Sequence, residues 1–109
     1  MKISVREAGE TRIVEVEGDV DLGTSPDLRR TLFQTLTEAP RLALNLAAIR
    51  YIDSSGIATL IEVLKDSQRR NKRFVLFGLS PAVRQVFHLT HVMRIFEVFQ
   101  TEEEAVASA

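Results

Sequence analysis

Residues 51–62 read YIDSSGIATLIE, and the change of pattern within them decides the fold. Just upstream, residues 41–46 (RLALNL) form the short apolar run that is typical of a buried strand. Downstream, Ile57, Leu60 and Leu64 recur at the i, i+3, i+7 spacing of an amphipathic helix. One acid, two hydroxyls and a glycine separate the two patterns. We therefore predict a strand-to-helix turn in which a serine caps the helix.

The two hydroxyls of this turn, Ser54 and Ser55, allow two interpretations. Either serine can cap the helix, and capping is the commoner role of serine at such a place. The serine that does not cap would carry its hydroxyl at the positive end of the helix dipole, where free backbone N–H groups would favour an added phosphate. Phosphorylation there would add about −1.5 to −2 charges without melting the helix. Residue chemistry alone leaves both roles open.

Composition limits the classes of protein to which this chain can belong. Its 109 residues, 45% of them apolar, suit one domain over residues 1–109 with a real core. The balance of 14 Lys and Arg against 15 Asp and Glu argues against nucleic acid or an anionic membrane as a partner. The absence of cysteine excludes disulfides and thiolate sites. A polar N-terminus and the lack of an apolar run near the ~20 residues that span a bilayer predict a soluble, cytoplasmic protein without membrane insertion.

The rest of the chain alternates between strand and helix patterns. We expect a hairpin of strands at 2–6 and 12–17, a helix to about residue 38 capped by Thr24 or Ser25, the strand at 41–46, a helix over 55–70, a strand at 73–77, a short helix capped by Ser80, a strand at 95–99 and a terminal helix with a capping box at 101–104. The predicted order is β-β-α-β-α-β-α-β-α. Such alternation favours parallel strands with right-handed crossovers. The fold class is α/β, with a mixed sheet of about five strands and helices mainly on one face.

Polar residues also gather in the predicted loop over residues 18–25. Loops that follow parallel strands meet at the carboxyl edge of a sheet, so Asp21 and Thr24 are expected to lie on one surface with Ser54. The acids of this loop, Asp19 and Asp21, are equally consistent with solvated turn residues. The functional alternative is a surface for docking or modification, without an obvious pocket.

Catalytic and cofactor-binding patterns are weak in this chain. Neither a P-loop nor a dinucleotide fingerprint is present, so no nucleotide cofactor is expected. Ile52 occupies the first glycine position of a nucleophile elbow around Ser54, and Asp53 is too close in sequence to orient a triad, which makes a hydrolase the weaker interpretation. His88 and His91 lie three residues apart without an acid or cysteine nearby to complete a metal site. We expect a protein that is not an enzyme and needs no cofactor or metal.

Four segments carry a resemblance to a known family: residues 18–21 (GDVD), 44–46 (LNL), 51–57 (YIDSSGI) and 79–83 (LSPAV). With these segments at these spacings, the chain resembles the STAS-domain family of bacterial anti-sigma-factor antagonists over essentially its whole length. The DSSG sequence after an apolar strand is the most specific part. The family often has leucine after this glycine, where the present chain has Ile57.

The resemblance implies a partner-switching protein. In such families the unphosphorylated antagonist binds an anti-sigma factor that is also a serine kinase, and the sigma factor is released. The kinase, which supplies the ATP and magnesium, phosphorylates the antagonist and so ends binding, and a serine phosphatase resets it. The resemblance makes Ser54 the phosphorylated serine and Asp21 the loop acid that assists kinase recognition. It matches Thr24 to a hydroxyl position in the same loop, and it makes Asp53 the acid that shapes the turn.

The start of the helix, with Ser55, Gly56, Ile57 and Ala58, completes the predicted docking surface. Such a surface can bury a neutral serine, whereas a dianion buried without a partner would cost several kcal/mol. Each ~1.4 kcal/mol of this cost lowers the affinity tenfold, so the switch needs no conformational change. An alternative within the same family is a STAS subunit of a lipid or anion transport system, bound to an ATPase or permease. The intact DSSG sequence favours the sigma-regulating role.

Overall fold

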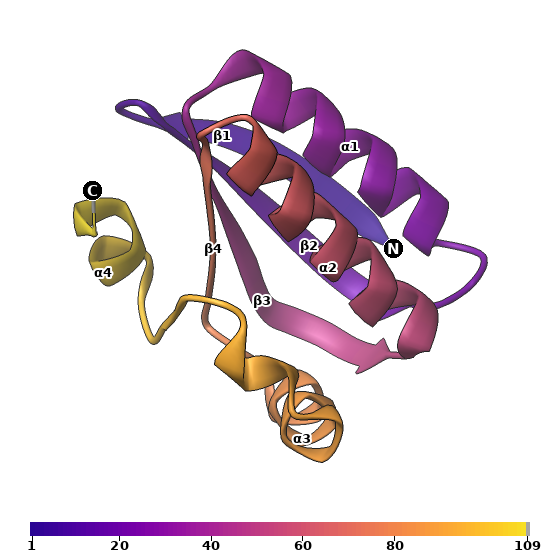
Figure 1. The fold of residues 1–109 in the computed structure, drawn as a ribbon. Coiled ribbons are helices and arrows are strands. Elements are labelled where there is room, and N and C mark those ends of the chain that lie inside the picture. Colours follow the sequence, from indigo (N-terminus) through magenta and orange to yellow (C-terminus); the bar gives the residue numbers. More distant parts are fainter. Residues whose placement is uncertain (109) are drawn as a thin grey trace.

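The computed structural model describes residues 1–108, which form one α/β domain (Figure 1). Its elements follow one another as β1 (Lys2–Ala8), β2 (Thr11–Val20), α1 (Ser25–Glu38), β3 (Arg41–Ile52), α2 (Ser54–Arg69), β4 (Arg73–Phe77), α3 (Pro81–Thr90), the 3-10 turn η1 (Val92–Arg94), β5 (Val98–Phe99) and α4 (Glu102–Ala107). The predicted order of strands and helices is confirmed, with η1 as an addition.

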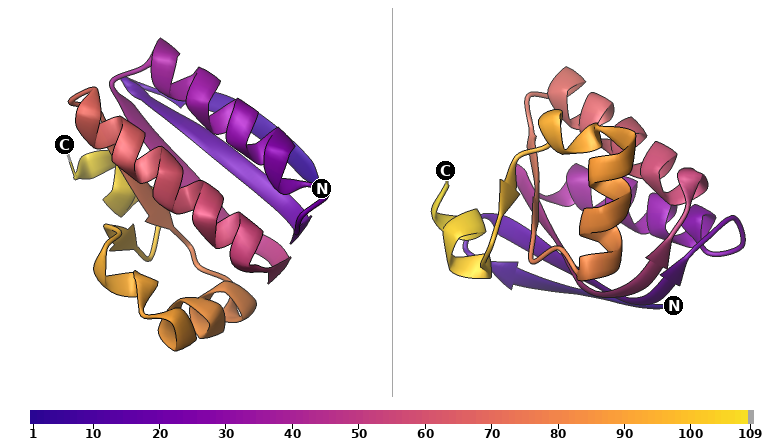
Figure 2. Two further views of the ribbon diagram at one scale, coloured as in Figure 1. Left: turned by 45° about the vertical axis from the view of Figure 1, so that its right-hand side comes forward. Right: turned by 90° about the horizontal axis from the view of Figure 1, so that it is seen from below.

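The five strands form one mixed sheet in the order β1-β2-β3-β4-β5. The β1–β2 hairpin is antiparallel, and the remaining neighbours are parallel, as expected for strands joined by helices. Figure 2 shows α1 and α2 lying together on one face of the sheet, with α4 at its other side. The prediction of a mixed five-stranded sheet with helices mainly on one face is confirmed.

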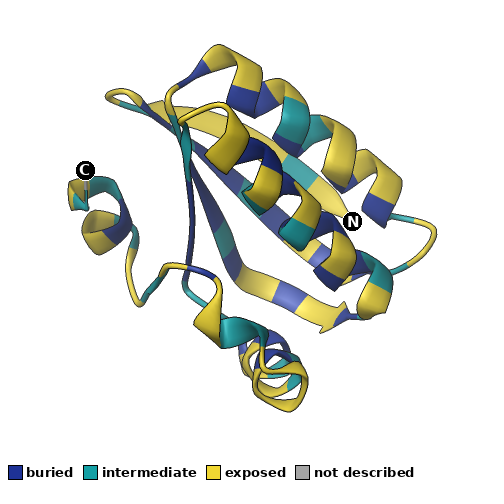
Figure 3. Ribbon diagram, viewed as in Figure 1, coloured by how far each residue is buried: buried dark blue, intermediate teal, exposed yellow. Residues whose placement is uncertain are grey.

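Alternate residues of β3 divide the apolar interior between the two faces of the sheet. Leu42 and Leu44 belong to the main core, which they share with residues of α1, α2 and α3, whereas Ala43 packs with Ala105 of α4. The leucines of α1 at four-residue spacing, Leu28, Leu32 and Leu36, are all fully buried in the main core. Figure 3 shows the resulting contrast between the buried inner sides and the exposed outer sides of α1 and α2.

Two strands extend further than the sequence pattern predicts. The parallel pairing of β2 with β3 continues to Val20 opposite Ile52, whereas β4 pairs with β3 only as far as Asn45. Register shifts interrupt the β2–β3 ladder, one of them next to Gly18, and they hide the regular alternation by which a strand is recognised in sequence. The predicted loop from residue 18 is therefore strand up to Val20.

The last strand is shorter than predicted, because only Val98–Phe99 pairs with β4. Ile95 ends the 3-10 turn instead of starting the strand. Phe96 is buried, with its ring centroid 5.8 Å from that of Phe87 and 6.3 Å from that of Phe74. This aromatic packing is worth about 0.5–1.5 kcal/mol per pair beyond area burial, so the segment before β5 is held by its side chains without strand pairing at Phe96.

No helix among residues 1–108 is both long enough and apolar enough to pass through a membrane.

Candidate partner-binding surface

Strands β2 and β3 end side by side, and the helix that follows each of them lies on the same face of the sheet (Figure 2). The backbone N–H of Asp53 donates to the carbonyl of Val20 at 3.2 Å, so the two strand ends are held together. The loop over residues 21–24, which leads into α1, therefore lies beside the turn that leads into α2. The two parallel strands thus bring both predicted segments to one edge of the sheet.

Asp53 caps α2, and the prediction that a serine does so was wrong. Its Oδ1 accepts from the backbone N–H groups of Ser55 at 2.9 Å and Gly56 at 3.3 Å, and from the Ser55 hydroxyl at 2.5 Å. A carboxylate suits this position because the positive end of the helix dipole favours negative charge. These bonds, led by that of the Ser55 hydroxyl, lower the pKa of Asp53 below its ordinary value. The backbone of Leu22 contributes to the same shift, which shows how close the 21–24 loop lies.

The cap also changes the surroundings of a phosphate on Ser54. The N–H groups of Ser55 and Gly56 already donate to Asp53, so for these two groups the prediction that free N–H groups would meet a phosphate was wrong. A phosphate on Ser54 would share the helix dipole with the Asp53 carboxylate and would be repelled by it.

The two adjacent serines differ in accessibility. Ser54 is exposed at the first turn of α2. The Ser55 hydroxyl is partly buried and is held by Asp53 on one side and by the hydroxyl of Ser25, at 3.3 Å, on the other. An enzyme approaching this turn from solvent meets the Ser54 hydroxyl first. The structure thus separates two serines that residue chemistry alone left equivalent.

The 21–24 loop is ordered by its own polar side chains. Asp21 Oδ1 accepts from the backbone N–H groups of Gly23 at 2.9 Å and Thr24 at 3.1 Å. The Thr24 hydroxyl accepts from the backbone N–H of Asp21 and donates to the carbonyl of Asp19, both at 2.9 Å. Thr24 stands at the N-cap position of α1, but its side chain makes no capping bond there, contrary to the prediction that Thr24 or Ser25 caps this helix. Its hydroxyl shapes the loop instead.

An apolar groove between α2 and α3 runs from Ser54 along the exposed side of α2. Its lining is almost wholly apolar and comprises Ser54, Ile57, Ala58, Ile61, Val86 and Thr90. Leu89, on the α3 side, is 73% exposed, and Leu22 in the 21–24 loop is 77% exposed. The expectation of a surface without a pocket was therefore incomplete. The groove depends on how far apart α2 and α3 are placed, and the periodicity of the sequence does not encode this distance.

Gly56 is required by the close approach of α2 to the sheet. A Cβ on this residue would lie 2.7 Å from Ile52 Cγ1 and 2.8 Å from Val20 Cγ1, closer than side-chain atoms pack. Gly56 thus allows the first turn of α2 to rest on the two strand ends. The glycine of the DSSG sequence sets the height at which Ser54 stands above the sheet.

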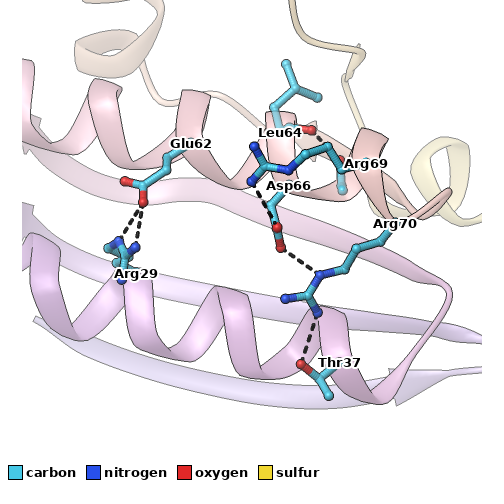
Figure 4. A network of polar contacts seen from close by, with 8 residues as sticks. Arg29, Thr37, Glu62, Leu64, Asp66, Arg69 and Arg70 are labelled. Carbon is cyan, nitrogen blue, oxygen red and sulfur yellow. Dashed lines mark hydrogen bonds and ion pairs between the residues drawn. The ribbon is translucent and has the colours of Figure 1, made fainter.

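The exposed sides of α1 and α2 are joined by charged side chains (Figure 4). Arg29 binds Glu62 at 2.6 and 2.9 Å, which lowers the pKa of Glu62, and the guanidinium of Arg29 lies 4.7 Å from the ring centroid of Phe33. Near the far end of the helices, Asp66 pairs with Arg70, which in turn donates to Thr37. The Arg29–Glu62 pair is about half exposed and contributes little stability, whereas Asp66 is buried and its pair with Arg70 lies within α2.

No group of three or more His, Cys, Asp or Glu side chains within residues 1–108 is placed to hold a metal ion. His88 and His91 are both exposed at the end of α3, where His91 has a left-handed backbone (φ 61°). The chemistry available at the carboxyl edge is therefore that of the exposed Ser54 hydroxyl, ordered carboxylates and an apolar groove.

A protein-family comparison agrees with this geometry, since the model described as the STAS domain matches residues 2–105. The chain belongs to the STAS domain family. Its relatives include two proteins named anti-sigma-B factor antagonist. The one from Listeria monocytogenes is 28% identical over 106 residues, which cover 95% of this STAS domain and 93% of the relative. The one from Staphylococcus aureus is 26% identical over 91 residues, which cover 83% of this STAS domain and 84% of the relative.

Solved structures show the same fold. An anti-sigma factor antagonist from Mycobacterium paratuberculosis has a TM-score of 0.82 at 22% identity, covering 98% of this STAS domain and 92% of that chain. The antagonist SpoIIAA in its unphosphorylated form has a TM-score of 0.79 at 20% identity, covering 96% and 93%. Bacillus SpoIIAA in the phosphorylated form has a TM-score of 0.73 at 20% identity, covering 97% of each chain. At these identities the likeness concerns the fold.

Proposed function

We propose that this STAS domain is an anti-sigma factor antagonist that works as a binding module and not as an enzyme. Its curated relatives carry that name, and its fold is that of solved antagonists. The observation that carries the proposal is the position of Ser54, an exposed hydroxyl between the ordered 21–24 loop and the α2–α3 groove. Its partner would be an anti-sigma factor that is also a serine kinase, acting in the cytoplasm where sigma factors act.

In the unmodified state, binding would bury apolar area around a neutral hydroxyl. Ile57 and Ala58 line the groove next to Ser54, and a partner covering them gains about 25 cal/mol for each Å² of apolar surface removed from water. The Ser54 hydroxyl can be covered at small cost if it keeps one hydrogen bond. The same contacts would displace the sigma factor from the anti-sigma factor.

Phosphorylation of Ser54 would end this binding through charge alone. The phosphate would stand at the end of an apolar groove and beside the Asp53 carboxylate, and within residues 1–108 no cationic side chain is bonded to Ser54 or Asp53. Covering it would cost several kcal/mol in lost hydration and repulsion. Because each ~1.4 kcal/mol is a tenfold loss, a decrease in affinity of about a hundredfold or more is expected. A serine phosphatase would restore the neutral surface.

The kinase would recognise Ser54 together with the loop beside it. Asp21 is half-buried, and its carboxylate shapes the loop through Gly23 and Thr24. This arrangement presents a defined acidic feature next to the hydroxyl that receives the phosphate. The ATP and magnesium would belong to the kinase, which leaves this chain the role of substrate and ligand.

Phosphorylation by the serine-kinase anti-sigma factor of the same organism tests the proposal. The parent protein, Ser54→Ala and the matched control Ser55→Ala are each incubated with the kinase and ATP, and the modified residue is located by mass spectrometry. We expect the parent and Ser55→Ala to be labelled at Ser54 and Ser54→Ala to stay unlabelled but bound to the kinase. Full labelling of Ser54→Ala would refute the assignment. Binding of a transport ATPase or permease without labelling would instead favour the transport-subunit alternative.

A further inference from the structure

We propose that Ser25 is a positioning residue, which ties the 21–24 loop to the start of α2 through Ser55. Only its effect on partner binding rests on the proposed function. Ser25 begins α1, and its relative exposure is 5%. By sequence it is only a candidate cap for its own helix, but the capping position belongs to Thr24. The Ser25 side chain is directed at the neighbouring helix instead.

The three side chains form a directed chain of hydrogen bonds from α1 to the α2 cap. Ser55 Oγ lies 2.5 Å from Asp53 Oδ1, and an ionised carboxylate can only accept, so the hydroxyl hydrogen of Ser55 points at Asp53. The oxygen of Ser55 is then free to accept from the Ser25 hydroxyl at 3.3 Å. The charge on Asp53 polarises Ser55 and makes its oxygen a better acceptor, so the two bonds strengthen each other.

Ser25 is joined to the 21–24 loop by its backbone. Its N–H donates to the carbonyl of Asp21 at 2.8 Å, while its side chain reaches Ser55. One residue thus connects Asp21 to the segment that carries Ser54, although the two lie more than thirty positions apart in the chain. A partner or kinase that reads Asp21 and Ser54 together needs their spacing fixed in advance, since ordering a loose loop on binding lowers affinity.

Besides Ser25, the backbone of Leu22 also acts at this place, because it lies close enough to Asp53 to help lower the pKa of that carboxylate. The remaining contacts between α1 and α2 lie elsewhere. The bond from Asp53 N–H to Val20 O joins the strand ends below the loop. The Arg29–Glu62 ion pair is exposed and lies a turn further along α1 and two turns along α2. Among the described residues, the Ser25 hydroxyl is the side chain that bridges the two helix starts.

Amide hydrogen exchange of the full chain, measured by NMR, tests the connection without any partner. In Ser25→Ala, exchange at Ser55 and Gly56 should rise about three- to tenfold, the range expected for one lost hydrogen bond. In Ser55→Ala, exchange at Gly23 and Thr24 should rise reciprocally. Thr35→Ala is the matched control, because Thr35 is a buried α1 hydroxyl that bonds only within its own helix. The inference would be overturned if the exchange rates at both segments stayed unchanged, or if Thr35→Ala changed them equally.

Binding to the serine-kinase anti-sigma factor then tests the consequence. Ser25→Ala should bind about three- to tenfold more weakly than the parent, and Thr35→Ala should match the parent. Adding Asp21→Asn to Ser25→Ala should cost less than the two single changes together, because a loosened loop no longer presents Asp21. Additive effects would contradict the positioning role. If the parent itself fails to bind, the proposed function is wrong, whereas the exchange result still decides the role of Ser25.

Discussion

Asp53 Oδ1 accepts a 2.5 Å hydrogen bond from the hydroxyl of Ser55, the second residue after it in the chain. This bond separates the roles of the two adjacent serines. Ser55 is committed to the cap of α2 and to Ser25, and Ser54 is left exposed above them. The DSSG sequence thus combines, in four residues, a cap, an exposed hydroxyl, a link to α1 and a glycine that lets the helix rest on the sheet.

The Asp53 cap should make stability depend on pH. Asp53→Ala removes the acceptor for two backbone N–H groups, and we expect the melting temperature at pH 7 to fall by about 4–8 °C. The pKa of Asp53 is lowered in the folded state, so its stabilising effect is present above the pKa of the unfolded chain, about 3.9. The effect is lost as the pH falls through the lower folded-state value. Thermal melts of the parent and Asp53→Ala should therefore converge below about pH 4.

Ser54→Ala is the control for that series. Its hydroxyl is exposed and the substitution leaves the Asp53 bonds in place, so its melting curve should follow the parent at every pH. If the difference in melting temperature between the parent and Asp53→Ala stays constant from pH 7 to pH 3, the charge of Asp53 does not stabilise the start of the helix.

Gly56→Ala should destabilise the domain because the new methyl group has no room. It would lie 2.7 Å from Ile52 and 2.8 Å from Val20, both buried, so the strand ends or α2 must move. Overpacking of this kind costs about 1–3 kcal/mol, measurable as a lower urea midpoint. Gly23→Ala is the matched control, since its methyl group would meet only Asp21 Oδ1 at 3.4 Å. Equal midpoints for the two variants would contradict the close-approach explanation.

Leu89, exposed on α3 three residues after the groove-lining Val86, should contribute to partner binding more than to stability. It is 73% exposed, so Leu89→Ala should leave the melting temperature nearly unchanged. If the anti-sigma factor covers the α2–α3 groove, truncation should weaken binding about tenfold, as for other apolar interface anchors. Val5→Ala on β1, where Val5 is 47% exposed, is the control and should bind like the parent. Isothermal titration calorimetry measures the affinity of each variant for the anti-sigma factor. Identical affinities of Leu89→Ala and the parent would place the contact surface elsewhere.

Sequence periodicity predicted the type and order of the elements because most helices and strands here are amphipathic in a regular way. It missed the ends of β2 and β3, since their last residues are strand only through pairing with each other across register shifts. At the site, the grouping of Asp21 and Thr24 near the DSSG turn followed from parallel topology. The choice of Asp53 over a serine as the cap did not follow from the sequence, because Asp and Ser cap helices about equally well. The Ser25–Ser55 bond and the groove depend on tertiary placement, which no local pattern encodes.

A charge-only test of the switch compares Ser54→Glu with Ser54→Gln, which have nearly the same size. If repulsion and lost hydration end binding, Ser54→Glu should bind the anti-sigma factor about ten- to a hundredfold more weakly than the parent, and Ser54→Gln should lose much less. Part of the difference should disappear between 0.05 and 0.5 M salt, because screening shortens the reach of the repulsion from about 14 to about 4 Å. Equal loss in both variants at every salt concentration would mean that side-chain bulk, and not charge, excludes the partner from Ser54.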